Sequence, residues 1–232
     1  MINNVDNVLD SAFCKRTSQD DRLHRWKSWD ANTPFAPTFD VPIWIDEIKD
    51  RVAIDLIDAI KENDLGMYKK LWEDYNIFKW EYHSIKSLQA SIARVYNDYM
   101  SCLEIEKENL NSLWIRGWAV ALDPGQEVPR HCHAYHENTY LSGNISLSDT
   151  GTVTEYLIPH LSSYYGSWKA ENKPGRITMF PSWIEHFVAP VEEKRYSIGF
   201  DIFDFNTIEY ISKNKIPGDK AQQTILHSIP LA

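Results

Sequence analysis

Residues 123–137 read DPGQEVPRHCHAYHE, and they place His131 and His133 one residue apart. In a β-strand, residues i and i+2 point to the same side, so both imidazoles can reach one metal ion. A third histidine, His186, closes the segment FPSWIEH about fifty residues further on. Histidines that arrive from separate strands are typical of a mononuclear metal site inside a β-barrel. This segment therefore predicts both the fold and the site.

Strand patterns surround the histidines. Side chains alternate from residue 113 onward, and one face takes Trp114, Arg116, Trp118, Val120 and Leu122. Further strand-like runs, separated by Gly, Pro and Asp turns, lie at 127–133, 139–147, 152–158, 176–180, 186–191 and 196–203. Such spacing indicates a mainly β, double-sheet jelly roll. The segment between Pro159 and Pro174 is long for a simple connection and is typical of a lid or binding loop.

Two apolar stripes with helical spacing precede the strands. The clearer stripe consists of Ile85, Leu88, Ile92, Val95, Tyr99 and Leu103. The other consists of Ile45, Ile48, Val52, Leu56 and Ile60, with Asp40-Val-Pro-Ile as the expected start of its helix. Both stripes predict helices that pack against the core.

Length and composition favour one domain over residues 1–232. Its expected parts are an N-terminal arm (1–40), helical support (41–110), the β-barrel core (113–205) and a C-terminal tail (206–232). We expect the arm to lie extended over the surface, with aromatic anchors such as Trp26 and Phe35. The tail is expected to hold a last helical turn and then an irregular end.

Charge and composition exclude several classes of partner. A net charge of −9, without any basic run, argues against nucleic acid. No apolar stretch approaches the twenty residues that cross a membrane. The polar, acidic N-terminus lacks the features of a signal peptide. Three widely spaced cysteines do not form a disulfide framework. We therefore expect a cytoplasmic protein.

Arg195 and Ser197 lie on one face of the strand that follows His186, again by alternation. A guanidinium holds a carboxylate through two parallel hydrogen bonds, and a neighbouring hydroxyl adds a third. The pair favours a dicarboxylate cosubstrate with one end on the metal and the other on Arg195.

These residues resemble a known family. Gly125-Gln126 followed by His131 and then His133 resembles the Gly-Gln…His-x-Asp segment of prolyl-hydroxylase-like 2-oxoglutarate/Fe(II) dioxygenases. The segments at residues 141–143 (LSG), 180–186 (FPSWIEH) and 195–200 (RYSIGF) are closer still to 2-oxoglutarate/Fe(II) oxygenases common in phage and marine bacterial sequences. The resemblance covers residues 113–203.

The resemblance implies a double-stranded β-helix, cupin-like, whose larger sheet carries the preceding helices. It implies that His131 and His186 bind Fe(II), and that Arg195 and Ser197 bind 2-oxoglutarate. It further implies a dioxygenase that uses O2 to hydroxylate a peptide or protein residue, or a small molecule. Succinate and CO2 would be released.

One position departs from the family: His133 stands where a carboxylate normally binds the metal. His133 can bind the metal itself, giving a three-histidine site. Alternatively Glu137 binds it from the following turn, or the second ligand position is loose and iron is held weakly. The strand spacing favours His133.

The segment Gly125-x5-His-x-His-x3-Glu137 also fits a cupin pattern, in which His131, His133, Glu137 and His186 all bind metal. This leaves open a cupin-like metal protein, or a dioxygenase that does not use 2-oxoglutarate. A barrel that binds no iron and acts as a binding module is a third reading. His136, Tyr140 and Trp168 are weaker candidates for contact with the substrate or with the metal ligands. The sequence does not identify the substrate.

Overall fold

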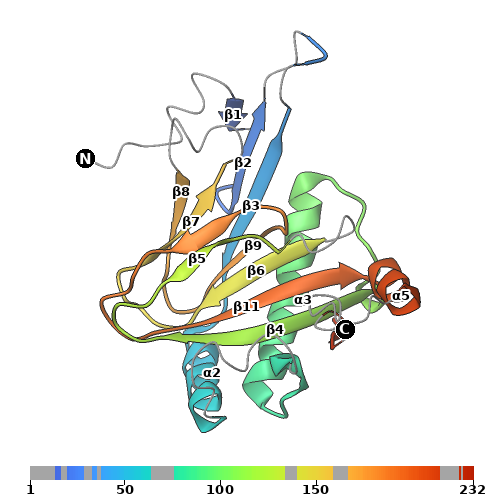
Figure 1. Cartoon of the computed structure of the whole chain (residues 1–232). Coiled ribbons are helices and arrows are strands. Elements are labelled where there is room, and N and C mark those ends of the chain that lie inside the picture. Colours follow the sequence, from blue (N-terminus) through green and yellow to red (C-terminus); the bar gives the residue numbers. More distant parts are fainter. Residues whose placement is uncertain are drawn as a thin grey trace.

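The computed structural model of the chain describes residues 14–16, 20–28, 33–35, 38–63, 76–133, 140–158, 167–214, 225 and 227–232. Its strands form two antiparallel sheets that face each other (Figure 1). The predicted mainly β jelly roll with supporting helices is confirmed. Among the described helices, none is both long enough and apolar enough to cross a membrane.

The larger sheet has the order β1-β2-β3-β9-β6-β11-β4-β12. Its strands are β1 (Cys14–Arg16), β2 (Leu23–Ser28), β3 (Asp40–Glu47), β9 (Arg176–Pro181), β6 (Leu141–Ser146), β11 (Arg195–Asp204), β4 (Leu113–Leu122) and β12 (Ile229–Pro230). The smaller sheet has the order β5-β10-β7-β8. Its strands are β5 (Val128–His131), β10 (His186–Val188), β7 (Val153–Leu157) and β8 (Ser167–Glu171).

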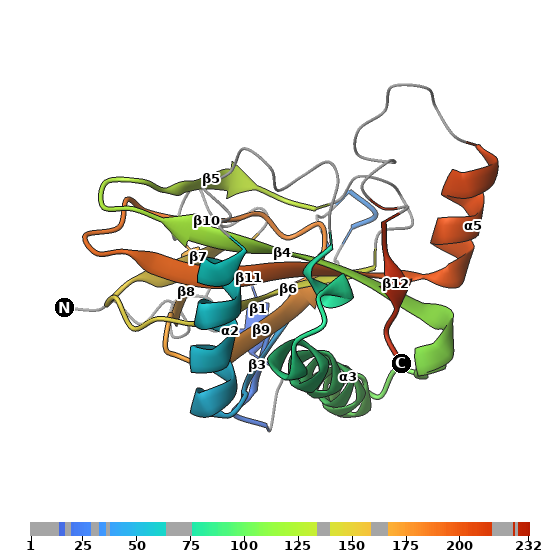
Figure 2. The same ribbon diagram turned by 90° about the horizontal axis from the view of Figure 1, so that it is seen from below.

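Helices α2 (Asp50–Glu62) and α3 (His83–Leu103) cover the outer face of the larger sheet. The smaller sheet, the larger sheet and these helices form three layers (Figure 2). The short helices η1 (Ile77–Lys79) and η2 (Leu110–Ser112) flank α3 in the chain. The predicted stripe of α3 is confirmed, since its apolar residues from Ile85 to Leu103 are buried in the main core.

Alternation on β4 and β11 separates two environments. Ile198 and Phe200 belong to the core beneath the helices, together with Ala119 of β4. Arg195, Ser197 and every second residue after them on β11 face the other way, toward the smaller sheet. Register pairs Ser197 with Val120, so the face predicted for Trp114 to Leu122 is the inner one. The polar residues of the site therefore lie between the sheets.

A tight turn at Pro124-Gly125 connects the two sheets and starts the histidine strand. Gly125 has φ +85°, in the left-handed region that favours glycine. Its N–H donates to the carbonyl of Val191 (2.8 Å), while the side chain of Gln126 accepts from the N–H of Asp123 (2.7 Å). The turn thereby fixes where β5, and His131 at its end, begins.

The segment at residue 40 differs from the expected helix start: Asp40–Glu47 is strand β3, and α2 begins at Asp50. β3 lies inside the larger sheet, between β2 and β9. Val41 and Ile43 pack between the sheets, whereas Trp44 packs against the helices. Burial on both faces gives an apolar run without clean alternation, which the sequence pattern does not distinguish from a helix.

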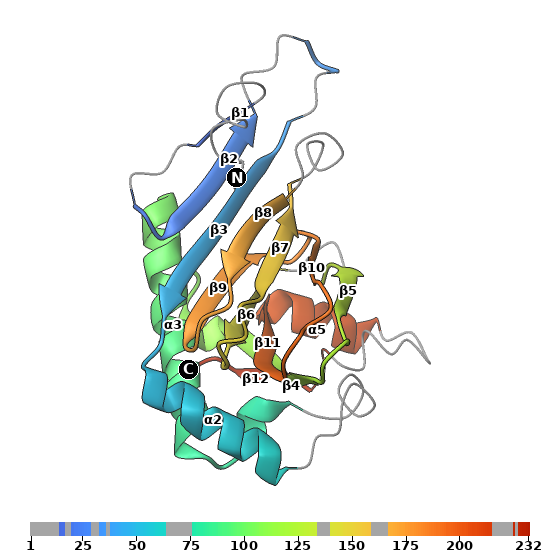
Figure 3. The ribbon, with the colours of Figure 1, turned by 90° about the vertical axis from the view of Figure 1, so that its left-hand side faces the viewer.

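The N-terminal segment also differs from an arm on the surface. β1 and β2 extend the larger sheet, and Figure 3 shows them continuing its edge beyond β3. Trp26 of β2 is fully buried between the sheets, so it is indeed an anchor. Phe35, in contrast, is 93% exposed and anchors nothing.

Two further expectations are corrected. Part of the long connection after Pro159 is a strand, β8, because Trp168 and Ala170 alternate inward while Lys169 is exposed. Residues 159–166 lie outside the described residues. In the tail, α5 (Phe205–Lys213) is longer than one turn, and Asp204 caps it by accepting from the N–H of Thr207 (2.6 Å). Ile229–Pro230 form β12 in the sheet where an irregular end was expected, while residues 215–224 and 226 lie outside the described residues.

Candidate metal centre

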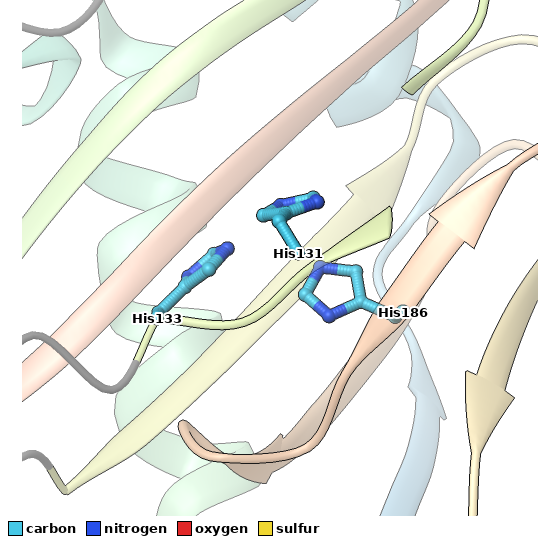
Figure 4. A group of neighbouring side chains, drawn as sticks. All are labelled: His131, His133 and His186. Atoms are coloured by element: carbon cyan, nitrogen blue, oxygen red, sulfur yellow. The ribbon is translucent and has the colours of Figure 1, made fainter. Parts of the chain in front are cut away.

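Three histidines from two neighbouring strands converge between the sheets. His131 ends β5, His186 begins β10, and the two are partners in the antiparallel register. His133 follows β5, where its N–H donates to the carbonyl of Ser182 (2.8 Å). One ring nitrogen from each histidine lies within 4.8 Å of the others. Figure 4 shows the three rings gathered around one space. The structure thus brings together the predicted set His131, His133 and His186.

Hydrogen bonds fix the tautomer of each ring. Nδ1 of His131 lies 2.7 Å from the carbonyl oxygen of Pro129, and Nδ1 of His186 lies 3.1 Å from that of Ile184. Nδ1 of His133 lies 2.6 Å from Oδ1 of Asp201. All three partners are acceptors, so each Nδ1 carries the proton and donates it. With the proton on Nδ1, Nε2 is the atom of each ring that can bind a metal ion.

Distance and charge both fit a divalent metal. A histidine nitrogen binds zinc at about 2.0–2.1 Å, and similar metals lie close to this value. Nitrogens within 4.8 Å of one another reach one ion after ring shifts of under about 1 Å. Burial, together with the neighbouring histidines, holds the pKa of His131 and of His186 below the ordinary value for histidine. Both directions favour the neutral imidazole, the form that binds metals.

Aromatic side chains enclose the cluster. The ring of Phe180 lies edge-on to His186 at 4.9 Å, and Tyr156 stacks on the same imidazole at 5.7 Å. Trp118 lies 5.3 Å from His133. The indole of Trp118 can lie there because its neighbour across the strands is Gly199, where a Cβ would stand 2.7 Å from the indole. These contacts restrict how the imidazoles can turn.

A buried polar network stands behind His133. Asp201 on β11 is fully buried, and its Oδ1 lies 2.6 Å from the hydroxyl of Ser142 on β6. That hydroxyl is also 2.8 Å from the hydroxyl of Ser182. The sequence prediction did not include Asp201. Alternation could have found it, since residues 195, 197, 199 and 201 share one face of β11.

Arg195 and Ser197 lie side by side on the inner face of β11. Both are buried, and Nη1 of Arg195 donates to the hydroxyl of Ser197 (2.9 Å). Burial raises the pKa of Tyr156, while hydrogen bonds from its neighbours and the charge of Arg195 act against that rise. Tyr156 thus connects the two regions, because its ring also stacks on His186.

The weaker candidates fall in different places. Tyr140 packs on the helix side of the larger sheet, where its hydroxyl lies 3.1 Å from that of Tyr96. Trp168 is buried between the sheets, with its ring 5.6 Å from Tyr156. Its contact with the histidines is indirect, through Tyr156, whose ring stacks on His186. His136 and Glu137 lie outside the described residues, so the described contacts concern His133 alone as second ligand.

Comparison with known proteins finds likeness in structure but not in sequence. No family model matches the chain, and no curated protein matches it in sequence. A prolyl-4-hydroxylase from Pseudomonas putida is 12% identical and superimposes with a TM-score of 0.54, over 70% of this chain and 92% of its own.

Two further structures are similar. A Trichoplax adhaerens prolyl hydroxylase, solved with a peptide fragment of hypoxia inducible factor, is 14% identical (TM-score 0.52; 71% of this chain and 84% of its own). A non-heme alpha-ketoglutarate-dependent epimerase of nogalamycin biosynthesis is 10% identical (TM-score 0.52; 70% and 76%). At such identities the likeness establishes the fold, which is the jelly roll of the 2-oxoglutarate/Fe(II) oxygenases.

Proposed function

We propose that this chain is an Fe(II)- and 2-oxoglutarate-dependent oxygenase. The observation that carries the proposal is the histidine cluster inside an oxygenase fold. Its three nitrogens lie within 4.8 Å of one another, and each ring is fixed by a hydrogen bond at Nδ1. Two histidines and a carboxylate are usual for non-haem Fe(II) oxygenases; here a third histidine takes the place of the carboxylate.

The geometry supports a role for each residue. His131, His133 and His186 would hold the iron. Arg195, only 3% exposed, and the neighbouring Ser197 offer charged and neutral donors to the far carboxylate of 2-oxoglutarate. When bound, iron with 2-oxoglutarate and O2 supplies the oxidising chemistry, and succinate and CO2 are released. The chain orients these groups and excludes water around them.

For the substrate, we propose hydroxylation of a peptide or protein residue, or of a small molecule. Structural neighbours of both kinds support this range, because one was solved with a peptide fragment and another belongs to nogalamycin biosynthesis. Fold alone carries no further weight on substrate.

A second candidate is a metal-dependent oxygenase that does not use 2-oxoglutarate. The observation that favours it is the ligand set, which within the described residues is three imidazoles without a carboxylate. Under this reading Arg195 is dispensable for metal chemistry and Glu137 contributes to the metal.

An anaerobic titration separates the two. The purified protein is loaded with Fe(II) and then titrated with 2-oxoglutarate, while the visible metal-to-ligand charge-transfer band of the chelated 2-oxo acid is followed. We expect a saturable band that Arg195→Ala removes at the same concentrations while iron binding remains. Arg130→Ala is the control, because Arg130 is exposed, precedes His131 directly and pairs with Glu185.

The outcomes decide between the readings. Iron binding without a band supports the second candidate, and Glu137 is then the next residue to change. A band that survives in Arg195→Ala rejects the assigned carboxylate site. A protein that binds no iron is not an oxygenase of either kind.

A further inference from the structure

Asp201 is the most deeply buried carboxylate near the histidines in the part of the chain that the structure describes. It is 0% exposed, and both of its hydrogen bonds from described side chains converge on Oδ1, from Nδ1 of His133 and from the hydroxyl of Ser142, each at 2.6 Å. We propose that Asp201 is a positioning residue that acts through His133. In the two-histidine, one-carboxylate arrangement, a carboxylate bound to the metal supplies a negative charge. Here Asp201 supplies that charge from behind His133. This rests on the metal-binding part of the proposed function.

The burial of Asp201 needs compensation. An ionised carboxylate is costly away from water unless donors and positive charge surround it. Oδ2 of Asp201 is buried and makes no hydrogen bond within the described residues. Arg116, which is 1% exposed, is the partner of Asp201 in the register of β4 and β11 and supplies one positive charge nearby. A divalent cation on Nε2 of His133 would add positive charge on the far side of the ring to which Asp201 is bonded.

The bond between Asp201 and His133 has two effects on a metal ligand. It holds the proton on Nδ1, so Nε2 is the ligand atom, and it orients the ring. It also increases the basicity of the imidazole, because a carboxylate is a stronger acceptor than a carbonyl. His131 and His186 have carbonyl partners instead. Among the described contacts, His133 is therefore the one ring of the three with a carboxylate partner.

Asp201 is itself held in a closed set of contacts. Ser142 lies between Asp201 and Ser182, with its hydroxyl 2.6 Å from Oδ1 and 2.8 Å from the hydroxyl of Ser182. The backbone carbonyl of Ser182 in turn accepts from the N–H of His133 (2.8 Å). The circuit spans β6, β11 and the segments after β5 and β9. Such a circuit fixes both the ring and its carboxylate, which is what a positioning role requires.

The test measures metal binding without cosubstrate or O2. Fe(II) affinity is determined anaerobically by equilibrium dialysis, and Co(II) absorption bands report the ligand field. Asp201→Asn keeps the shape and an acceptor but removes the charge. We expect affinity to fall by about 10- to 100-fold, as for other carboxylates behind metal-bound histidines, with shifted Co(II) bands. Ser142→Ala, which leaves the bond between Asp201 and His133, is expected to cost less.

Repeating the Asp201→Asn substitution in a second background, the His133→Asp variant, distinguishes this role from a merely structural one. His133→Asp restores a carboxylate ligand and removes the imidazole through which Asp201 acts. In that background we expect Asp201→Asn to leave affinity unchanged or to improve it, because two adjacent buried carboxylates repel each other. If Asp201→Asn lowers metal affinity by the same factor in wild type and in His133→Asp, the proposal is overturned. Unchanged affinity after Asp201→Asn in wild type also overturns it.

The failure of the proposed function would look different. If the protein binds Fe(II) but gives no band with 2-oxoglutarate, the assignment of 2-oxoglutarate as cosubstrate fails. The effect of Asp201→Asn on metal affinity is still expected in that case. A wild-type protein that binds neither Fe(II) nor Co(II) overturns both proposals.

Discussion

His131 and His186 are partners in the antiparallel register of β5 and β10, and their ring centroids lie 4.4 Å apart. Residues that are opposite each other in a ladder keep that distance through the hydrogen bonds of the sheet. The pair is therefore set by the backbone, before any metal binds. His133 joins it from beyond the end of β5, held by Ser182.

His186→Ala is expected to reduce Fe(II) affinity by more than about 100-fold, since losing a ligand costs more than losing the group that orients it. The apo-protein should remain folded, because the ladder between β5 and β10 is made by backbone groups. Metal content after dialysis and far-UV circular dichroism measure the two effects. His83→Ala, at the start of α3, is the control and should retain metal. Retention of iron by His186→Ala would contradict the three-histidine site.

Much of this site could be predicted because period-two alternation is local. Arg195 and Ser197 share a face of β11 whatever the rest of the chain does. The same rule was applied to His131 and His133, but β5 ends at His131, and His133 is placed by its hydrogen bond to Ser182. The structure differs from the prediction where a strand is buried on both of its faces. Asp40-Val-Pro-Ile has the residues of a helix start, yet it opens strand β3, in which Val41 and Trp44 are buried on opposite faces. No local pattern shows that a strand lies inside a sheet.

Alternation places Asp201 on the inner face of β11 but does not give its partner. Its partner, His133, is 68 residues away, and the pairing depends on how β11 lies beside β6 and under the end of β5. β8 was missed although SWKAE alternates, because Trp168 and Ala170 are only two inward residues in an otherwise polar connection. A short strand of this kind becomes recognisable when its partner, β7, is known.

Trp26→Ala tests whether β2 belongs to the core. Trp26 is fully buried between the sheets, with its ring 5.7 Å from Trp168. Removing a buried indole leaves a cavity and costs about 3–5 kcal/mol in the free energy of unfolding. Urea unfolding measures this. Phe35→Ala, at a site that is 93% exposed, should stay within about 0.5 kcal/mol of wild type. A small effect of Trp26→Ala would restore the view of residues 1–40 as a detachable arm.

The contacts of Asp46 predict that part of the free energy of unfolding is lost in acid. Although its burial acts to raise the pKa of Asp46, the hydrogen bonds from Arg94 and from the N–H of Glu47 outweigh burial and hold that pKa below its ordinary value. A carboxyl whose pKa is lower in the folded state than in the unfolded state stabilises the fold at pH values above its unfolded-state pKa. This stabilisation is lost as the pH falls through its folded-state pKa. The ion pairs involve arginines that are nearly half exposed, so solvent reduces the effect to about 0.5–1 kcal/mol.

Urea unfolding of wild type and Asp46→Asn measures this component. We expect the variant to be less stable at pH 7 and the difference to shrink below about pH 4, the range in which free aspartate is protonated. A difference that is constant from pH 7 to pH 3 would show that the loss comes from packing and not from charge.

Gly199→Ala probes the contact between β11 and the wall of the metal site. A Cβ at residue 199 would lie 2.7 Å from the indole of Trp118, which packs 5.3 Å from His133. Real Cβ atoms do not approach so closely, so the indole must move toward or away from the imidazole. We expect a loss of about 1–3 kcal/mol in unfolding free energy from overpacking, together with shifted Co(II) absorption bands.

Gly117→Ala is the matched control on the other face of β4. A Cβ there would lie 2.5 Å from the ring of Phe78, which packs in the core beneath the helices. It should therefore lower the free energy of unfolding by a similar mechanism while leaving the Co(II) bands unchanged. If both variants shift the bands equally, the metal site responds to global strain in the larger sheet, and Trp118 has no specific role in holding His133.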